Sequence, residues 1–168
     1  MNEVEKVTSK TIKDGGVLAV LYFDIHTKTK DKAQHIGAGF VEQLLREPGV
    51  VYAVGEIDEP LQDGEMFSTY VQVKILVSGF QHLVNICAIH SPFNVEILRP
   101  DEIRLPLSQA HEMLMGISTV TGDYKKYIIE KTSTPEELQR YQMILEKKAE
   151  LGKKILGKKV GNDEKGTG

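Results

Sequence analysis

Hydrophobic and polar positions alternate along the chain in two different periods, which together predict a mixed α and β fold. Val17–Thr27 is an almost continuous apolar run that is rich in β-branched and aromatic residues, so it predicts a strand buried on both faces. In the segment that follows, apolar residues recur at steps of three and four, as in an amphipathic helix. Pro48 and Gly49 then end this predicted helix, because proline disfavours helix at the residue before it.

Three further strands and one helix complete the predicted domain. Val50–Ile57 and Ser68–Val77 read as strands, and a polar loop separates them. A short apolar helix follows Gly79 and stops before Pro92, and Phe93–Pro100 is the last strand. The order β-α-β-β-α-β predicts an α+β, ferredoxin-like sandwich over residues 17–105, with both helices on one face of the sheet.

The segments on either side of this sandwich carry different signals. Residues 1–16 are polar and end in two glycines, so we expect a flexible N-terminal arm. Residues 106–157 predict two additional C-terminal helices, which we expect to cover the open face of the sheet. The second has an N-terminal signature of Thr134, Pro135 and Glu137. Residues 158–168 are rich in glycine and charge, and we expect them to be disordered.

Composition narrows the class of protein. The apolar fraction is 40% and the charged fraction 27%, both typical of a globular chain, and the net charge of −3 argues against an overall nucleic-acid or membrane protein. The single Cys87 excludes an intramolecular disulfide and suits a cytoplasmic location. No apolar run approaches the roughly 20 residues that a membrane span needs. We therefore expect neither a membrane partner nor a cofactor or metal.

The segment "PGVVYAVGEID" resembles a motif of a known family. It is similar to the amino-acid-binding regulatory domain of the leucine-responsive regulators, a relative of the ACT domain, in which a helix runs into P-x-V, a strand and a G-[DE]-x-D turn. Pro48 and Val50 match the first part, and Gly55, Glu56 and Asp58 match the second. The resemblance covers residues 17–98, and the chain has no helix-turn-helix ahead of it. It implies a stand-alone domain that binds a small molecule.

The leading prediction for function is therefore a non-catalytic, ACT-like module for ligand binding or assembly. Its predicted ligand is an amino acid or similar small metabolite, because carboxylates at a strand end can hold an ammonium group. The candidate ligand-binding residues lie in the loop after the first strand and in the acidic turn: His26, Thr27, Gly55, Glu56 and Asp58. The alternative interpretation of that turn is a polar exit from a strand, with glycine chosen for its backbone freedom.

Two other functions remain open. Asp24 and His26 are two residues apart on a predicted strand and so share a face, where a carboxylate–imidazole pair could serve acid–base catalysis in an oligomer cleft. The last helix carries a basic run that could contact nucleic acid, composed of Lys147, Lys148, Lys153, Lys154, Lys158 and Lys159. No aromatic residues lie between these lysines to stack on bases, so we do not expect nucleic acid as a partner.

The sequence also predicts a homo-oligomer. We expect the third strand, Ser68–Val77, to lie at an exposed sheet edge, where Lys74 is its single charge. The predicted helix that begins near Ser108 has more apolar surface than one sheet face can bury, contributed by Met113, Met115, Ile117, Tyr124 and Tyr127. A dimer or a dimer of dimers, with a binding site shared between copies, is the expected assembly.

Overall fold

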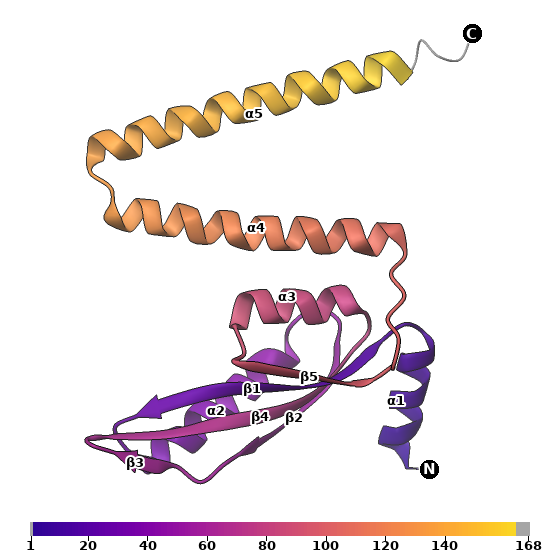
Figure 1. The fold of residues 1–168 in the computed structure, drawn as a ribbon, viewed down its shortest axis with the longest axis vertical. Helices are drawn as coiled ribbons and strands as arrows, with labels where there is room; N and C mark the ends of the chain where they lie inside the picture. Colours follow the sequence, from indigo (N-terminus) through magenta and orange to yellow (C-terminus); the bar gives the residue numbers. More distant parts are fainter. Residues whose placement is uncertain (1, 164–168) are drawn as a thin grey trace. The chain divides into compact units, whose positions relative to one another are not determined.

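The computed structural model describes the backbone of residues 2–163 and the side chains of residues 2–157. The chain divides into two compact units, residues 1–120 and 121–168, and each is described by itself. The first contains α1 (Glu3–Lys13), β1 (Val17–Thr27), α2 (Lys30–Leu45), β2 (Val50–Ile57), β3 (Leu61–Asp63), β4 (Met66–Val77), α3 (Phe80–His90), β5 (Asn94–Arg99) and the first half of α4 (Leu107–Thr132) (Figure 1). The second contains the rest of α4 and α5 (Pro135–Asp163). The described part is thus an α+β structure with five strands and five helices.

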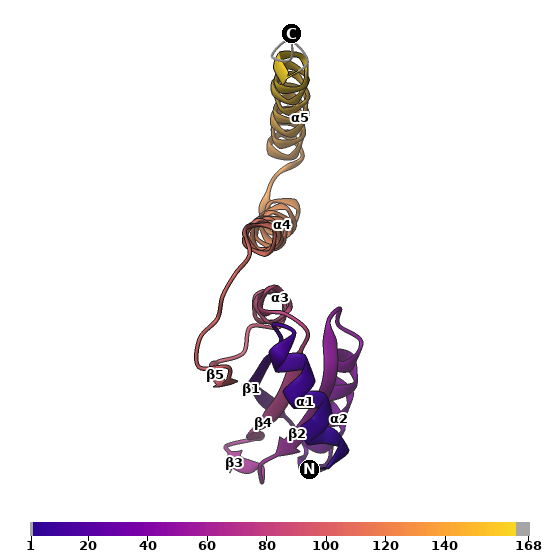
Figure 2. The ribbon, with the colours of Figure 1, turned by 90° about the vertical axis from the view of Figure 1, so that its right-hand side faces the viewer.

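All strands of the first unit belong to one antiparallel sheet. Its order is β2-β4-β1-β5, and the short β3 pairs with the outer end of β4. Figure 2 shows β5, β1, β4 and β2 following one another in this order. The central position predicted for β1 is confirmed. The prediction that the third long strand lies at a sheet edge is wrong, because β4 pairs with both β1 and β2.

One face of the sheet is packed against α2 and α3. Alternate residues of β1 and β4 point to this face, and Leu21, Val73 and Ile75 are fully buried there. Ala33 and Leu44 from α2, and Leu83 and Ile86 from α3, complete the core. Burial of each large aliphatic side chain contributes about 1.5–3 kcal/mol, so this face supplies most of the stability of the unit.

The N-terminal segment is a helix, which corrects the prediction of a loose arm over residues 1–16. Asn2 and Glu5 form a capping box: the Glu5 amide donates to Asn2 Oδ1 at 2.8 Å, and the Asn2 amide donates to Glu5 Oε2 at 2.9 Å. The hydroxyl of Thr8 lies 3.1 Å from the hydroxyl of Tyr52 on β2. Because α1 contacts β1 and β4, it shields one end of the second sheet face, where three apolar side chains are buried: Leu18, Val20 and Leu76.

The C-terminal helices differ from the prediction in two respects. The first half of α4 lies beside α3, on the helix-covered side of the sheet, so it does not cover the open face. Helix α5 continues to Asp163, so the prediction of disorder is wrong for residues 158–163, while residues 164–168 lie outside the described part. The predicted start of α5 is confirmed, because the Thr134 amide donates to Glu137 Oε2 at 2.8 Å. Among the described helices, none combines the length and hydropathy that a membrane crossing requires.

Candidate functional site

The part of the second sheet face that α1 leaves open carries a cluster of aromatic rings. Tyr22 comes from β1, Tyr70 from β4 and Phe93 from the residue before β5. The ring centroids are 6.2 Å apart for Tyr22 and Tyr70, 6.1 Å for Tyr22 and Phe93, and 6.4 Å for Tyr70 and Phe93. Phe93 is 59% exposed and Tyr70 is 36% exposed. Three adjacent aromatic side chains that stay in contact with water on a sheet face are typical of a binding surface.

Carboxylates surround this aromatic cluster. The Tyr22 hydroxyl donates to Glu96 Oε2 at 3.3 Å, and the Tyr70 hydroxyl is hydrogen-bonded to the side chain of Asp58. Partial burial, followed by the charge of Glu96, raises the pKa of Tyr22. The hydrogen bond to Asp58 and its charge raise the pKa of Tyr70. Both phenols are therefore held in their neutral form next to negative charge.

Two shallow hollows adjoin Tyr70 and Asp58, which line both of them. The first has a volume of about 270 Å³, and its other lining residues are Asp24, Glu59, Leu61, Ser68, Thr69 and Phe93. The second has a volume of about 240 Å³, and its other lining residues are Glu56, Ile57 and Gln72. Of the four carboxylates along the two hollows, Glu59 already pairs with Lys30, at 2.8 Å. The remaining three give the surface a local excess of negative charge next to exposed rings.

His26 lies at the outer end of this face in a chain of hydrogen bonds. Its Nε2 is 2.9 Å from Asp24 Oδ2, and its Nδ1 is 2.9 Å from Ser68 Oγ. The pairing of β1 with β4 places His26 directly opposite Ser68. The His26 and Asp24 side chains are 57% and 63% exposed, so water screens the interaction between them. The arrangement is a serine–imidazole–carboxylate chain without the burial that usually accompanies such a chain in an active site.

The structure brings together some of the predicted ligand-binding residues and separates others. Glu56, Asp58 and His26 share the open face. Thr27 and Gly55 point to the opposite, helix-covered face, so their prediction as ligand contacts is corrected. The Thr27 hydroxyl donates to the backbone oxygen of Thr29 at 2.8 Å, and Thr27 is 5% exposed.

Gly55 has a packing reason for its identity. A Cβ at this position would lie 2.4 Å from Cγ2 of Val41, so the glycine permits α2 to pack closely on β2. The four main residues that the sequence did not reveal are Tyr22, Ser68, Tyr70 and Phe93. For Tyr70 a signal existed, because it alternates with the apolar positions of its strand.

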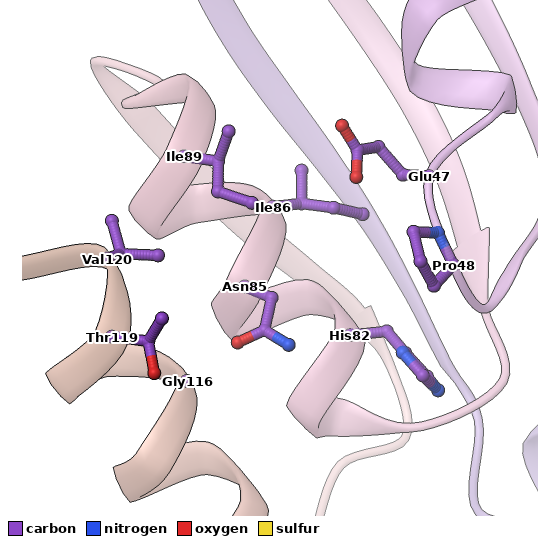
Figure 3. Close-up of a pocket in the computed structure, with 9 residues that line it drawn as sticks. All are labelled: Glu47, Pro48, His82, Asn85, Ile86, Ile89, Gly116, Thr119 and Val120. Carbon is purple, nitrogen blue, oxygen red and sulfur yellow. The ribbon is translucent and has the colours of Figure 1, made fainter. Parts of the chain in front are cut away.

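A further pocket lies between α3 and α4, within the first unit (Figure 3). Its volume is about 290 Å³, and it is lined by Glu47, Pro48, His82, Asn85, Ile86, Ile89, Gly116, Thr119 and Val120. Asn85 Oδ1 is buried here without a hydrogen-bond partner among the described residues. Glu47 is paired with His90, since its Oε1 lies 2.7 Å from Nε2. The pocket thus offers a mostly aliphatic wall and one free acceptor, with no unpaired charge to select a ligand.

Metal and thiol chemistry find little support in the described part of the chain. Residues 2–157 contain no group of three or more His, Cys, Asp or Glu side chains arranged to hold a metal ion. Cys87 is half-buried next to the core, and burial raises the pKa of its thiol. Because the thiolate is the nucleophilic form, Cys87 is suited to packing and not to catalysis.

Comparison with known proteins assigns the chain to a family. Residues 18–151 match the MJ0538 family, an uncharacterised family. The match spans most of the sequence, so the chain belongs to the MJ0538 family. It also includes every strand of the sheet and the whole open face. No curated protein and no solved structure matches the chain.

Proposed function

We propose that this member of the MJ0538 family is a non-catalytic binding module, whose open sheet face holds the ammonium group of an amino acid or a similar small amine. One observation carries the proposal: the exposed rings of Tyr22, Tyr70 and Phe93 share a face with Asp24, Glu56 and Asp58. Aromatic faces and carboxylates both attract an organic cation, while the rings also contact its apolar part. The predicted ligand-binding residues Glu56 and Asp58 belong to this surface.

The same face offers a counter-charge for a ligand carboxylate. Lys74 lies on β4 two residues beyond Gln72, so its side chain projects from the same face of the sheet. It is exposed, and no acidic partner lies within ion-pair distance among the described residues. An amino acid carries both an ammonium and a carboxylate, and the surface has groups that complement each of them.

The topology supports placing this module in the ferredoxin-like class, to which ACT-like domains belong. The four long strands follow the order β2-β4-β1-β5, with α2 after β1 and α3 after β4. This is the arrangement expected of two interleaved β-α-β halves. We include the ACT-like resemblance of residues 17–98 in the proposal, and its support is this topology together with the acidic turn at the end of β2.

The expected affinity is modest because the site is open to water. A cation on an exposed aromatic face gains about 0.5–1 kcal/mol, and an exposed ion pair gains about 0.2–1 kcal/mol. Two or three such contacts of each kind amount to roughly 3–5 kcal/mol, which corresponds to a dissociation constant near the millimolar range. A site of this strength responds to metabolite levels and does not retain its ligand.

Isothermal titration with matched ligands tests the proposal. We expect an apolar amino acid to bind, its amide to bind because the ammonium remains, and its N-acetyl derivative to lose binding because the cation is gone. Asp58→Asn should weaken binding of the amide severalfold. Glu102→Gln is the matched control, because Glu102 is exposed and pairs with Arg104 away from the sheet face. Equal binding of amino acid and N-acetyl derivative would reject the ammonium site.

A second candidate function is favoured by one specific observation, the hydrogen-bond chain Ser68–His26–Asp24. In that reading Ser68 Oγ attacks an acyl carbon and passes its proton to His26, which Asp24 orients. A fluorophosphonate probe distinguishes the two functions, because it modifies an activated serine. Labelling of Ser68 that disappears in both Ser68→Ala and His26→Gln supports the enzyme. Labelling no greater than that of the exposed Ser78 excludes it.

A further inference from the structure

Helix α5 presents an apolar stripe that nothing in the described chain covers. Its apolar residues recur at three- and four-residue steps along one side and define the α5 stripe: Leu138, Tyr141, Ile144, Leu145, Leu151 and Ile155. Ile144 is 51% exposed, Leu151 is 57% exposed and Ile155 is 53% exposed. The second half of α4 belongs to the same compact unit and leaves these side chains in water.

A helix of this length needs a partner for such a stripe. The 29 residues of α5 extend over about 43 Å at 1.5 Å per residue. Helical stability in proteins comes mainly from the packing of an amphipathic face, and propensity contributes less. Gly152 and Gly157 lie within the second half of α5, where each lowers the intrinsic stability of the helix by up to about 1 kcal/mol. Packing along the stripe would compensate for them.

Charge along α5 indicates which partner fits. In the first half, the three carboxylates of Glu136, Glu137 and Glu146 outweigh Arg140. In the second half, four lysines outweigh Glu150: Lys147, Lys148, Lys153 and Lys154. The two halves therefore have opposite net charge. A second copy of α5 that runs antiparallel would place each acidic half against a lysine-rich half, whereas a parallel copy would oppose like charges at both ends.

We propose that α5 pairs with α5 of a second copy of this chain, antiparallel and through the α5 stripe, to form a two-fold symmetric dimer. Two-fold symmetry uses the same surface of both copies, so the apolar stripe and both charge contacts are satisfied at once. The opposed helix dipoles of an antiparallel pair act in the same direction. The lysines of α5 then serve assembly, and nucleic acid is not their partner. This inference is independent of the sheet-face ligand site.

Sedimentation equilibrium of the full chain between about 1 and 100 μM provides the first test. We expect twice the chain mass of 18.8 kDa. Ile144→Glu and Leu151→Glu should each weaken dimerisation by about 100-fold or more, because the dimer buries the introduced charge twice. Met143→Glu is the matched control, since Met143 is 50% exposed on the opposite side of the same helix and should leave the dimer intact.

The control also separates the proposal from its competitors. A mass of 18.8 kDa at every concentration overturns the dimer. Equal loss with Met143→Glu and Ile144→Glu would show that general destabilisation of α5, and not the α5 stripe, is responsible. Circular dichroism of each variant verifies that helix content is kept. A dimer that survives both stripe substitutions would have to form through another surface, and that outcome also overturns the proposal.

A cysteine substitution tests the orientation. In a Cys87→Ser background, Leu138→Cys near the start of α5 would oxidise efficiently to its own copy in a parallel pair. In the antiparallel pair the two positions lie at opposite ends, so we expect no disulfide-linked dimer. Doubling the salt concentration should weaken the dimer, because the contacts between acidic and lysine-rich halves are exposed to screening. Efficient Leu138→Cys crosslinking, or association that salt strengthens, contradicts the antiparallel arrangement.

Discussion

The two faces of the central sheet are built from the same strands but have opposite properties. On the helix-covered face, Leu21 and Val73 are fully buried among aliphatic side chains from α2 and α3. On the open face, the neighbouring residues Tyr22 and Gln72 remain partly exposed among carboxylates and hydroxyls. Because strand side chains alternate in direction, one residue step moves a side chain from the core to the binding surface. Stability and ligand recognition are thereby separated within each strand.

The largest effect is expected from the covered face. Leu21→Ala removes a side chain that is 0% exposed and leaves a cavity between the sheet and its helices, so it should lower the free energy of unfolding by about 2–5 kcal/mol. Urea denaturation followed by circular dichroism measures the loss. The comparison is Tyr22→Ala on the next residue, which should cost no more than about 1.5 kcal/mol, since it removes aromatic contacts on an exposed surface. Equal losses would contradict the division of roles between the faces.

Two glycines of α2 sharpen the comparison at the helix layer. A Cβ on Gly37 would lie 2.4 Å from Cδ1 and 2.9 Å from Cγ1 of Ile57, whereas one on Gly39 would meet nothing within 4 Å. Gly37→Ala should therefore destabilise by about 1–3 kcal/mol through overpacking, even though alanine favours helix. Gly39→Ala should stabilise by about 0.5–1 kcal/mol. Thermal unfolding of both variants decides whether α2 packs on the sheet as described, and a stabilising Gly37→Ala would refute it.

A smaller effect is expected where α1 covers one end of the open face. Thr8→Val keeps the shape of the side chain but removes the hydroxyl that lies 3.1 Å from the Tyr52 hydroxyl and 2.7 Å from the Val4 oxygen. The expected loss is about 1 kcal/mol, as for a typical hydrogen bond. Thr11→Val, three residues along the same helix, is the comparison and should have less effect. Hydrogen exchange of the α1 amides measures the local stability. Unchanged protection in Thr8→Val would show that α1 does not depend on this contact.

The smallest effect on stability concerns the binding surface itself. Asp58→Asn removes the charge and the hydrogen bond that raise the pKa of Tyr70, so this pKa should fall toward its ordinary value. A raised pKa in the folded protein contributes stability below the pKa of the unfolded chain, and this contribution is lost as the pH rises through the folded value. The variant should therefore show less alkaline destabilisation than the parent protein, with little change near neutral pH. NMR titration of the Tyr70 ring measures the shift, and Glu102→Gln should leave it unchanged.

Local patterns in the sequence sufficed for the main elements of the fold. Apolar alternation and the Pro48-Gly49 break predicted β1, α2, β2 and β4 close to their observed bounds. Helix α1 was missed because its capping box involves only Asn2 and Glu5 within a polar segment. The central position of β4 depends on which strands pair, and no local pattern determines that choice. The acidic turn was found for the same reason that Gly55 was misassigned, since a motif identifies neighbours along the chain but not the direction of each side chain.

The candidate site was accessible only in part for a related reason. Asp24 and His26 are close in sequence, so their proximity could be predicted from the strand period. Ser68 joins them only through the register of β1 with β4, and Phe93 approaches Tyr22 only through the pairing of β5. Long-range register depends on the packing of the whole sheet. A surface assembled from three strands therefore becomes visible only in the folded structure.

The most direct test of the central claim is an NMR titration of the full chain with an apolar amino acid amide, followed through the aromatic and backbone resonances. We expect saturable shifts at Tyr22, Tyr70 and Phe93 and at the Asp58 amide, with little change at Leu83 or Ile86 on the covered side. The N-acetyl derivative of the same amino acid should produce no such shifts at equal concentration. Shifts confined to the residues between α3 and α4, or equal responses to both compounds, would contradict a cation-binding sheet face.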